Sequence, residues 1–69
     1  METKKGKFIK ELRESIGMTK EQFAFYLRIP LRTVYAWEAG ERAPSEYVFN
    51  LIETKIKYDK LVEKIKEFL

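Results

Sequence analysis

Residues 30–40 decide the fold, and they read Pro30-Leu31-Arg32-Thr33-Val34-Tyr35-Ala36-Trp37-Glu38-Ala39-Gly40. Pro30 lacks a backbone N–H, which is no loss in the first turn of a helix, and Gly40 is a typical residue after the last turn. Val34 and Trp37 are three residues apart, so they lie on one helix face. We therefore expect a short helix that Val34 and Trp37 hold against a core.

The composition restricts the possible functions. A chain of 69 residues forms one small domain whose core supplies only about 3–5 kcal/mol of net stability. The sequence contains no Cys and no His, so a thiolate metal site, a disulfide and the commonest general base are all excluded. We expect a protein that is not an enzyme, with no catalytic residues, no metal and no cofactor.

The net charge and the hydropathy point to a folded protein in the cytoplasm. The formal net charge of +3 is mildly basic and compatible with a nucleic-acid partner. The 45% apolar fraction is too high for a disordered chain. No apolar run approaches the roughly 20 residues that span a bilayer, and the first residues lack the apolar segment of a signal peptide. We expect no membrane association.

Apolar residues recur at helical spacing between the glycines and prolines, which predicts an all-α fold. A first helix is expected over about residues 4–16, and Gly17 is placed as its C-terminal cap. Its apolar stripe consists of Phe8, Ile9, Leu12 and Ile16. The rest of its circumference is expected to be solvated and carries Lys5, Lys7, Lys10, Glu11, Arg13 and Glu14.

A second helix is expected over residues 20–27. Thr19 and Gln22 have the spacing of a capping box, in which each side chain bonds the backbone of the other residue. Phe23, Ala24 and Leu27 share the inner face, and the small side chain of Ala24 allows another helix to cross closely.

The last 25 residues, 45–69, contain no Gly or Pro, and Ser45 is a plausible N-cap. They can form one helix of roughly 37 Å, or two helices with a bend near residues 54–58. One apolar stripe is expected to close the core over the first helix and comprises Val48, Ile52 and Ile56. A second stripe follows a partial heptad and comprises Leu51, Tyr58, Leu61, Ile65 and Phe68.

Two motifs now coincide, Phe23-Ala24-x-x-Leu27-x-Ile29 and Val34-x-x-Trp37-Glu38-x-Gly40. Together with Leu12-Arg13 upstream and Pro44-Ser45 downstream, they make residues 7–54 resemble the lambda-repressor-like (Cro/cI, XRE) helix-turn-helix family. The structural core that this resemblance implies is Leu12, Phe23, Ala24, Leu27, Ile29, Val34 and Trp37.

The resemblance implies a compact bundle of four to five helices with a helix-turn-helix and a long C-terminal helix. The helix from Lys20 would cross the DNA backbone, and the helix from Pro30 would lie in the major groove. The implied function is sequence-specific binding of double-stranded DNA by a transcriptional regulator, expected to be a repressor, in the nucleoid of a prokaryote or in a phage. Small proteins of this family often regulate mobile elements or act as antitoxins in toxin–antitoxin operons.

The resemblance also assigns DNA contacts by position. The base-reading residues are Leu31, Arg32, Tyr35 and Ala36. The phosphate-binding residues are Lys20, Arg28, Thr33 and Arg42. Arg32 is the strongest candidate, because a guanidinium can bond both O6 and N7 of guanine, worth about 1–3 kcal/mol of discrimination. Trp37 and Glu38 are interpreted as structural, Trp37 in the core and Glu38 as a residue that ties loops or caps.

Three positions depart from the family pattern. Lys20 stands where Gln is frequent, and can hold a phosphate as a point charge. Arg28 stands where Gly is usual in the turn, so it must accept a positive φ or the turn must differ. Pro30 replaces the usual Ser or Thr, which removes that hydroxyl's cap and its phosphate contact.

We divide the chain into a DNA-binding domain, residues 1–54, and a helical extension, residues 55–69. The exposed apolar residues that could bind a homodimer partner or a toxin are Phe25, Tyr26, Tyr58, Leu61, Ile65 and Phe68. Three arrangements remain open: the tail folds back over its own domain, it forms a two-fold dimer, or it binds another protein. The alternative function is a protein-interaction module, such as an antitoxin, that keeps the fold.

Overall fold

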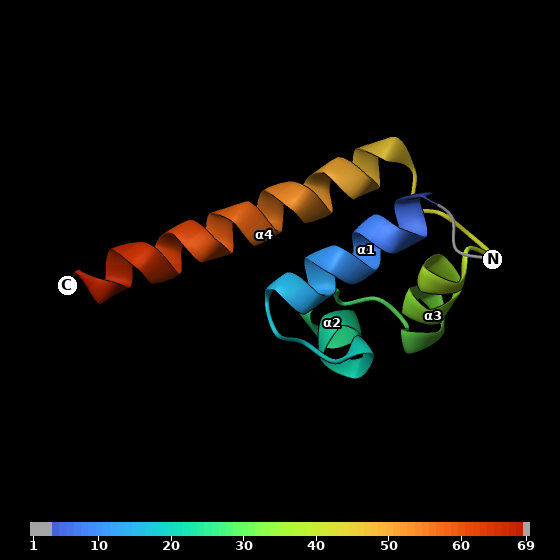
Figure 1. Cartoon of the computed structure of the whole chain (residues 1–69), viewed down its shortest axis with the longest axis horizontal. Coiled ribbons are helices and arrows are strands. Elements are labelled where there is room, and N and C mark those ends of the chain that lie inside the picture. The colour runs from blue at the N-terminus through green and yellow to red at the C-terminus, as the bar shows by residue number, and fades with distance from the viewer. Residues whose placement is uncertain (1–3, 69) are drawn as a thin grey trace.

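The computed structural model describes residues 4–68, and these residues form four helices and no strand. The helices are α1 (Lys4–Ser15), α2 (Lys20–Leu27), α3 (Leu31–Ala39) and α4 (Glu46–Glu67). The prediction of an all-α bundle with a long C-terminal helix is therefore confirmed (Figure 1). Within this described part of the chain, no helix is long and apolar enough to cross a membrane.

The helices begin where the side chains satisfy free backbone amides. Thr19 Oγ1 accepts a hydrogen bond from the Gln22 amide at 3.1 Å, and Gln22 Oε1 accepts one from the Thr19 amide at 2.9 Å. The predicted capping box is therefore present. Ser45 Oγ accepts from the Val48 amide at 3.2 Å and starts α4 in the same way.

All four helices contribute to one apolar core. Its buried members are Ile9, Phe23, Ala24, Val34, Trp37, Ile52 and Ile56. Leu12, Leu27 and Ile29 are partly buried and pack against this cluster. Two residues that the predicted stripes placed inward are less buried than expected, since Phe8 is 45% exposed and Val48 is also exposed. Both lie near the first turns of α1 and α4, where less of the body covers them.

Helix α4 lies alongside α1 and then continues past the body of the protein (Figure 1). The Phe8 and Phe49 rings meet edge to face at 6.4 Å near the start of both helices. Further along, Lys60 Nζ donates to Ser15 Oγ at 3.2 Å. α4 runs without a break through residues 54–58, so the single-helix alternative is the correct one.

A buried ion pair joins α1 to α3. Arg13 Nε donates to Glu38 Oε2 at 2.7 Å, and Nη2 donates to Oε1 at 3.0 Å. Arg13 Nη1 also donates to the Met18 carbonyl at 2.9 Å. The hydrogen bond to Glu38 raises the pKa of Arg13 above its ordinary value.

The expectation that Arg13 lies on the solvated side of the first helix is thus wrong. Arg13 follows Ile9 by four residues and shares its buried face. A charged side chain can stay there because Glu38 neutralises it and each guanidinium nitrogen donates a hydrogen bond. Glu38 is structural, as interpreted, but it acts by pairing with α1 rather than by tying loops or capping a helix.

Tyr26 also differs from the expectation that it belongs to an exposed patch. Its ring is partly buried and stacks on Phe23 at 6.3 Å. Its hydroxyl donates to the carboxylate of Asp59, and Lys55 Nζ lies 4.5 Å from the ring centroid. Helix α4 therefore covers Tyr26, but it leaves Phe25 87% exposed. The idea that the tail folds back over the domain holds only for Tyr26.

Loss of one member of the Arg13–Glu38 pair should destabilise the fold strongly. We expect Arg13→Met or Glu38→Leu alone to lower the free energy of unfolding by about 3–5 kcal/mol, because each leaves an uncompensated buried charge. The double variant should recover much of that loss, since no charge remains buried. Urea unfolding followed by circular dichroism measures all three variants, and a single variant that is already largely unfolded without urea agrees with this expectation. Single variants as stable as the wild type would contradict this role.

The Tyr26 contact should make stability fall at alkaline pH. Burial, and after it the hydrogen bond to Asp59, raises the pKa of Tyr26 above its ordinary value. The unfolded chain therefore loses the phenol proton first, so this contribution is complete below about pH 10 and declines above it. Urea unfolding from pH 7 to 11 should show a constant gap between wild type and Tyr26→Phe up to about pH 10 and a narrowing gap above. A gap that is the same at every pH would refute the assignment.

Candidate nucleic-acid interface

Helix α3 is held to the body along one side only. Val34, Trp37 and Glu38 are its buried residues, and at 100° per residue they occupy one arc of the helix. Helix α2 packs closely on α3, and Ala24 of α2 is buried in the same core cluster. These contacts leave the opposite arc of α3 free.

The free arc of α3 carries three of the four residues predicted to read bases. Leu31 and Arg32 are exposed, and Tyr35 is 48% exposed. Ala36 is only partly exposed, because it lies at the edge of the arc. Ala39, which the sequence reasoning did not select, is exposed on the same arc. We call Leu31, Arg32, Tyr35 and Ala39 the reading arc.

Lys20 connects the start of α2 to the reading arc. Its Nζ lies 4.6 Å from the centroid of the Tyr35 ring, a cation–π contact worth about 0.5–1 kcal/mol at an exposed site. The contact places a positive charge beside the aromatic side chain of the arc. Sequence reasoning selected both residues but not their contact, because they lie on different helices and no periodic pattern relates them.

The turn between α2 and α3 depends on a left-handed residue. Arg28 has φ of 57°, and it is the only non-glycine residue with positive φ in the described part of the chain. Its amide bonds the Phe25 carbonyl at 3.1 Å, and the Ile29 amide bonds the Ala24 carbonyl at 3.0 Å. These bonds close α2 tightly, so Arg28 accepts the positive φ, which is the first of the two alternatives for this turn.

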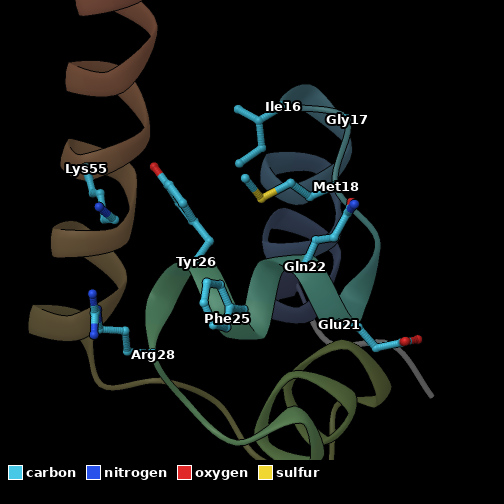
Figure 2. Close-up of a pocket in the computed structure, with 9 residues that line it drawn as sticks. All are labelled: Ile16, Gly17, Met18, Glu21, Gln22, Phe25, Tyr26, Arg28 and Lys55. Atoms are coloured by element: carbon cyan, nitrogen blue, oxygen red, sulfur yellow. The ribbon is translucent and has the colours of Figure 1, made fainter.

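The other predicted phosphate-binding residues are distributed around α2 and α3. Arg28 lies at the opposite end of α2 from Lys20 and lines a surface depression of about 820 Å³ with Phe25, Tyr26 and Lys55 (Figure 2). Thr33 is partly buried in the first turn of α3. Arg42 is exposed just beyond the end of α3, so it borders the helix that carries the reading arc.

The net positive charge lies in the part of the chain that carries α3. Helix α4 contains five lysines and five acidic residues, so it is neutral. The residues before α4 contain nine basic and six acidic residues, which accounts for the whole net charge of +3. Phosphate contacts need cationic side chains near the reading element, and this distribution supplies them there.

Comparison with known protein families gives one match. A family model described as Helix-turn-helix matches residues 9–59, which include α2, α3 and most of α1 and α4. Comparisons with curated proteins and with solved structures give no match.

The left-handed turn predicts opposite effects for two substitutions. Arg28→Gly should raise the free energy of unfolding by about 0.5–1 kcal/mol, because glycine adopts positive φ without strain. Gly17→Ala should lower it by about 1 kcal/mol. Gly17 is a matched control, since it has φ of +66° and an added Cβ would meet no atom within 4 Å. Thermal and urea unfolding measure both. A loss of stability in Arg28→Gly would mean that the arginine side chain stabilises the turn more than its backbone strains it.

Proposed function

Because this chain belongs to the lambda-repressor-like (XRE) helix-turn-helix family of DNA-binding transcription regulators, we propose that it binds double-stranded DNA sequence-specifically through α3. In this proposal α3 lies in the major groove and α2 crosses the backbone beside it. The family is not known for catalysis, which agrees with a binding function.

The observation that carries the proposal is the two-sided character of α3. One side is anchored by Val34, Trp37 and the ion-paired Glu38. The other side presents exposed side chains that no core contact needs. A helix that reads bases must be rigidly positioned and must still leave its outer side chains free for base edges, and α3 meets both conditions.

Within the reading arc, Arg32 supplies the strongest base contact. Its exposed guanidinium can donate two hydrogen bonds to one guanine in the major groove. Leu31 and Ala36 can offer only apolar contact, for instance with a thymine methyl group. Tyr35 can bond a base or a phosphate, and Lys20 stacked on its ring brings a cation to the same place.

Phosphate contacts then orient the domain on the duplex. Lys20 at the start of α2 and Arg42 beyond α3 flank the reading arc, so they can engage the backbone on either side of the groove. Arg28 and Thr33 complete the proposed set. Because such contacts carry no sequence information, they should contribute affinity and salt dependence but little specificity.

We further propose that the protein acts as a repressor. A domain bound across an operator excludes other proteins from the same DNA by occupancy alone. Activation, in contrast, requires an additional favourable contact with the transcription machinery.

A second candidate function is the binding of a protein partner, as in an antitoxin. The observation that favours it is Phe25, which is 87% exposed and lines the depression with Arg28 and Lys55 (Figure 2). Aromatic side chains and Arg are enriched at protein interfaces. Duplex DNA binding and partner binding are separable, because Phe25 is not part of the reading arc.

Substitution of Arg32 should remove sequence preference without unfolding the protein. We expect Arg32→Ala to weaken binding to a site selected from a random duplex library by about 10-fold or more, while binding to unrelated duplex changes much less. Fluorescence anisotropy with both duplexes measures the ratio. An unchanged ratio would refute the reading arc, and no duplex binding by the wild type even at low salt would favour the protein-partner function.

Two lysine variants provide the controls for that experiment. Lys20→Ala should weaken binding to both duplexes alike and reduce the log–log salt slope by about 0.9, the value for one lost phosphate contact. Lys66→Ala removes the same charge from an exposed position near the end of α4 and should leave the slope unchanged. An equal effect of both variants would show that only the overall charge matters.

A further inference from the structure

Helix α4 carries an apolar stripe that faces away from the protein's own core. The stripe consists of Tyr47, Leu51, Tyr58, Leu61, Ile65 and Phe68, all of them exposed. With Thr54 included, the spacings are four, three, four, three, four and three, which is a heptad pattern over three repeats. The structure thus extends the predicted partial heptad by one turn toward the start of α4.

The stripe is separate from the residues that α4 uses inside its own domain. Ile52 and Ile56 are buried in the core, and at 100° per residue they lie about 100–160° around the helix from Leu51 and Tyr58. Phe68, at the end of the stripe, is 88% exposed. α4 is therefore apolar on two sides, and only one of them is covered.

We propose that the stripe pairs with the same stripe of a second copy in a parallel two-stranded coiled coil. An aromatic side chain buries about 150–250 Å², and the stripe contains three aromatic and three aliphatic side chains. The area of the stripe therefore approaches that of a standard interface, which is about 800 Å² per partner. A second copy carries a stripe of the same length and the same heptad spacing, so it can cover the whole stripe of the first copy.

The charges on α4 argue against other occupants. The helix carries five lysines and five acidic residues, so it has no net charge with which to attract an anionic lipid surface or a strongly charged protein. A second copy requires no net charge, because the contact depends on apolar residues at the a and d positions of the heptad.

The positions that flank the stripe favour the parallel orientation. With Tyr58 at an a position, Lys57 and Lys64 occupy successive g positions and Val62 occupies the e position between them. In an antiparallel pair, the g positions of the two helices face each other and would bring these lysines together. In a parallel pair, g faces e, so Lys57 lies against the partner's apolar Val62 and the repulsion is avoided.

A parallel pair would bring both reading arcs to the same end of the assembly. α3 lies near the start of α4, while the end of α4 extends away from the body (Figure 1). The pairing itself does not rest on the proposed DNA function, since the stripe shares no residue with the reading arc. If both hold, the selected DNA site should be a two-fold symmetric sequence.

The first test measures self-association without DNA. At about 100 μM, a dimer with a micromolar Kd is largely formed, and analytical ultracentrifugation should show wild-type dimers. Leu61→Asp/Ile65→Asp should sediment as a monomer and keep the wild-type thermal unfolding of a dilute sample, because both positions are exposed within one chain. A monomeric wild type, or a dimer that survives the double substitution, would overturn the proposal.

The second test determines the orientation with single cysteines, since the sequence has none. In a parallel pair each d position faces its own copy, so Leu61→Cys should form a disulfide-linked dimer on mild oxidation. Glu63→Cys, exposed and on the opposite side of α4 from the stripe, is the matched control and should not. In an antiparallel pair a d position faces an a position of the partner, so position 61 faces position 51 or 58 instead.

The remaining outcomes contradict the proposal in distinct ways. Cross-linking that forms only when Leu61→Cys is mixed with Leu51→Cys or Tyr58→Cys would show antiparallel pairing. A monomer that co-sediments with vesicles of anionic phospholipid would identify a membrane surface as the occupant. Neither experiment contains DNA, so a monomeric wild type would not argue against the reading arc. In the same way, a protein that fails to bind DNA could still form the proposed dimer.

Discussion

The bidentate contact between Arg13 and Glu38 is the interaction on which the arrangement of the helices depends. It joins α1 to α3, and the third bond, from Arg13 to the Met18 carbonyl, adds the connection that leads to α2. Apolar contacts tolerate small rotations, whereas a buried charge is compensated only where all of its donors meet acceptors. The pair therefore restricts the angle of α3, and with it the direction in which Arg32 and Tyr35 point.

The net charge and the exposed apolar stripe lie in different parts of the molecule. The residues before α4 hold all of the net positive charge, and α4 is neutral but apolar on two sides. One side of α4 completes the core through Ile52 and Ile56, and Asp59 binds the hydroxyl of Tyr26. The other side is the heptad stripe. A small domain with a limited core thus gains stability from α4 and presents a second apolar surface on the same helix.

Most of the secondary structure could be predicted because its signals are local. The capping box at Thr19 and the stop at Gly40 involve neighbouring residues, and both form as expected. At Arg28, where the sequence left a positive φ or a different turn open, the structure has the positive φ. Predictions that depended on which side of a helix is covered were less accurate. Arg13 is polar, so a hydrophobic pattern could not place it inside, and Tyr26 is covered only because α4 passes beside it. The contact of Lys20 with Tyr35 gave no periodic signal at all.

The order of residues alone was sufficient to specify the first three helices, the start of the fourth, the apolar face that seats α3 and the family to which the chain belongs, because spacing and capping are properties of a short stretch of chain. Whether residues 45–69 form one helix or two stayed open until the structure showed an unbroken α4. Only the tertiary structure decided that Arg13 and Glu38 neutralise each other in the interior, that Tyr26 is covered while Phe25 is not, and that the heptad stripe of α4 faces outward along its whole length. The physical reason is that burial and charge pairing depend on which distant segments meet in space.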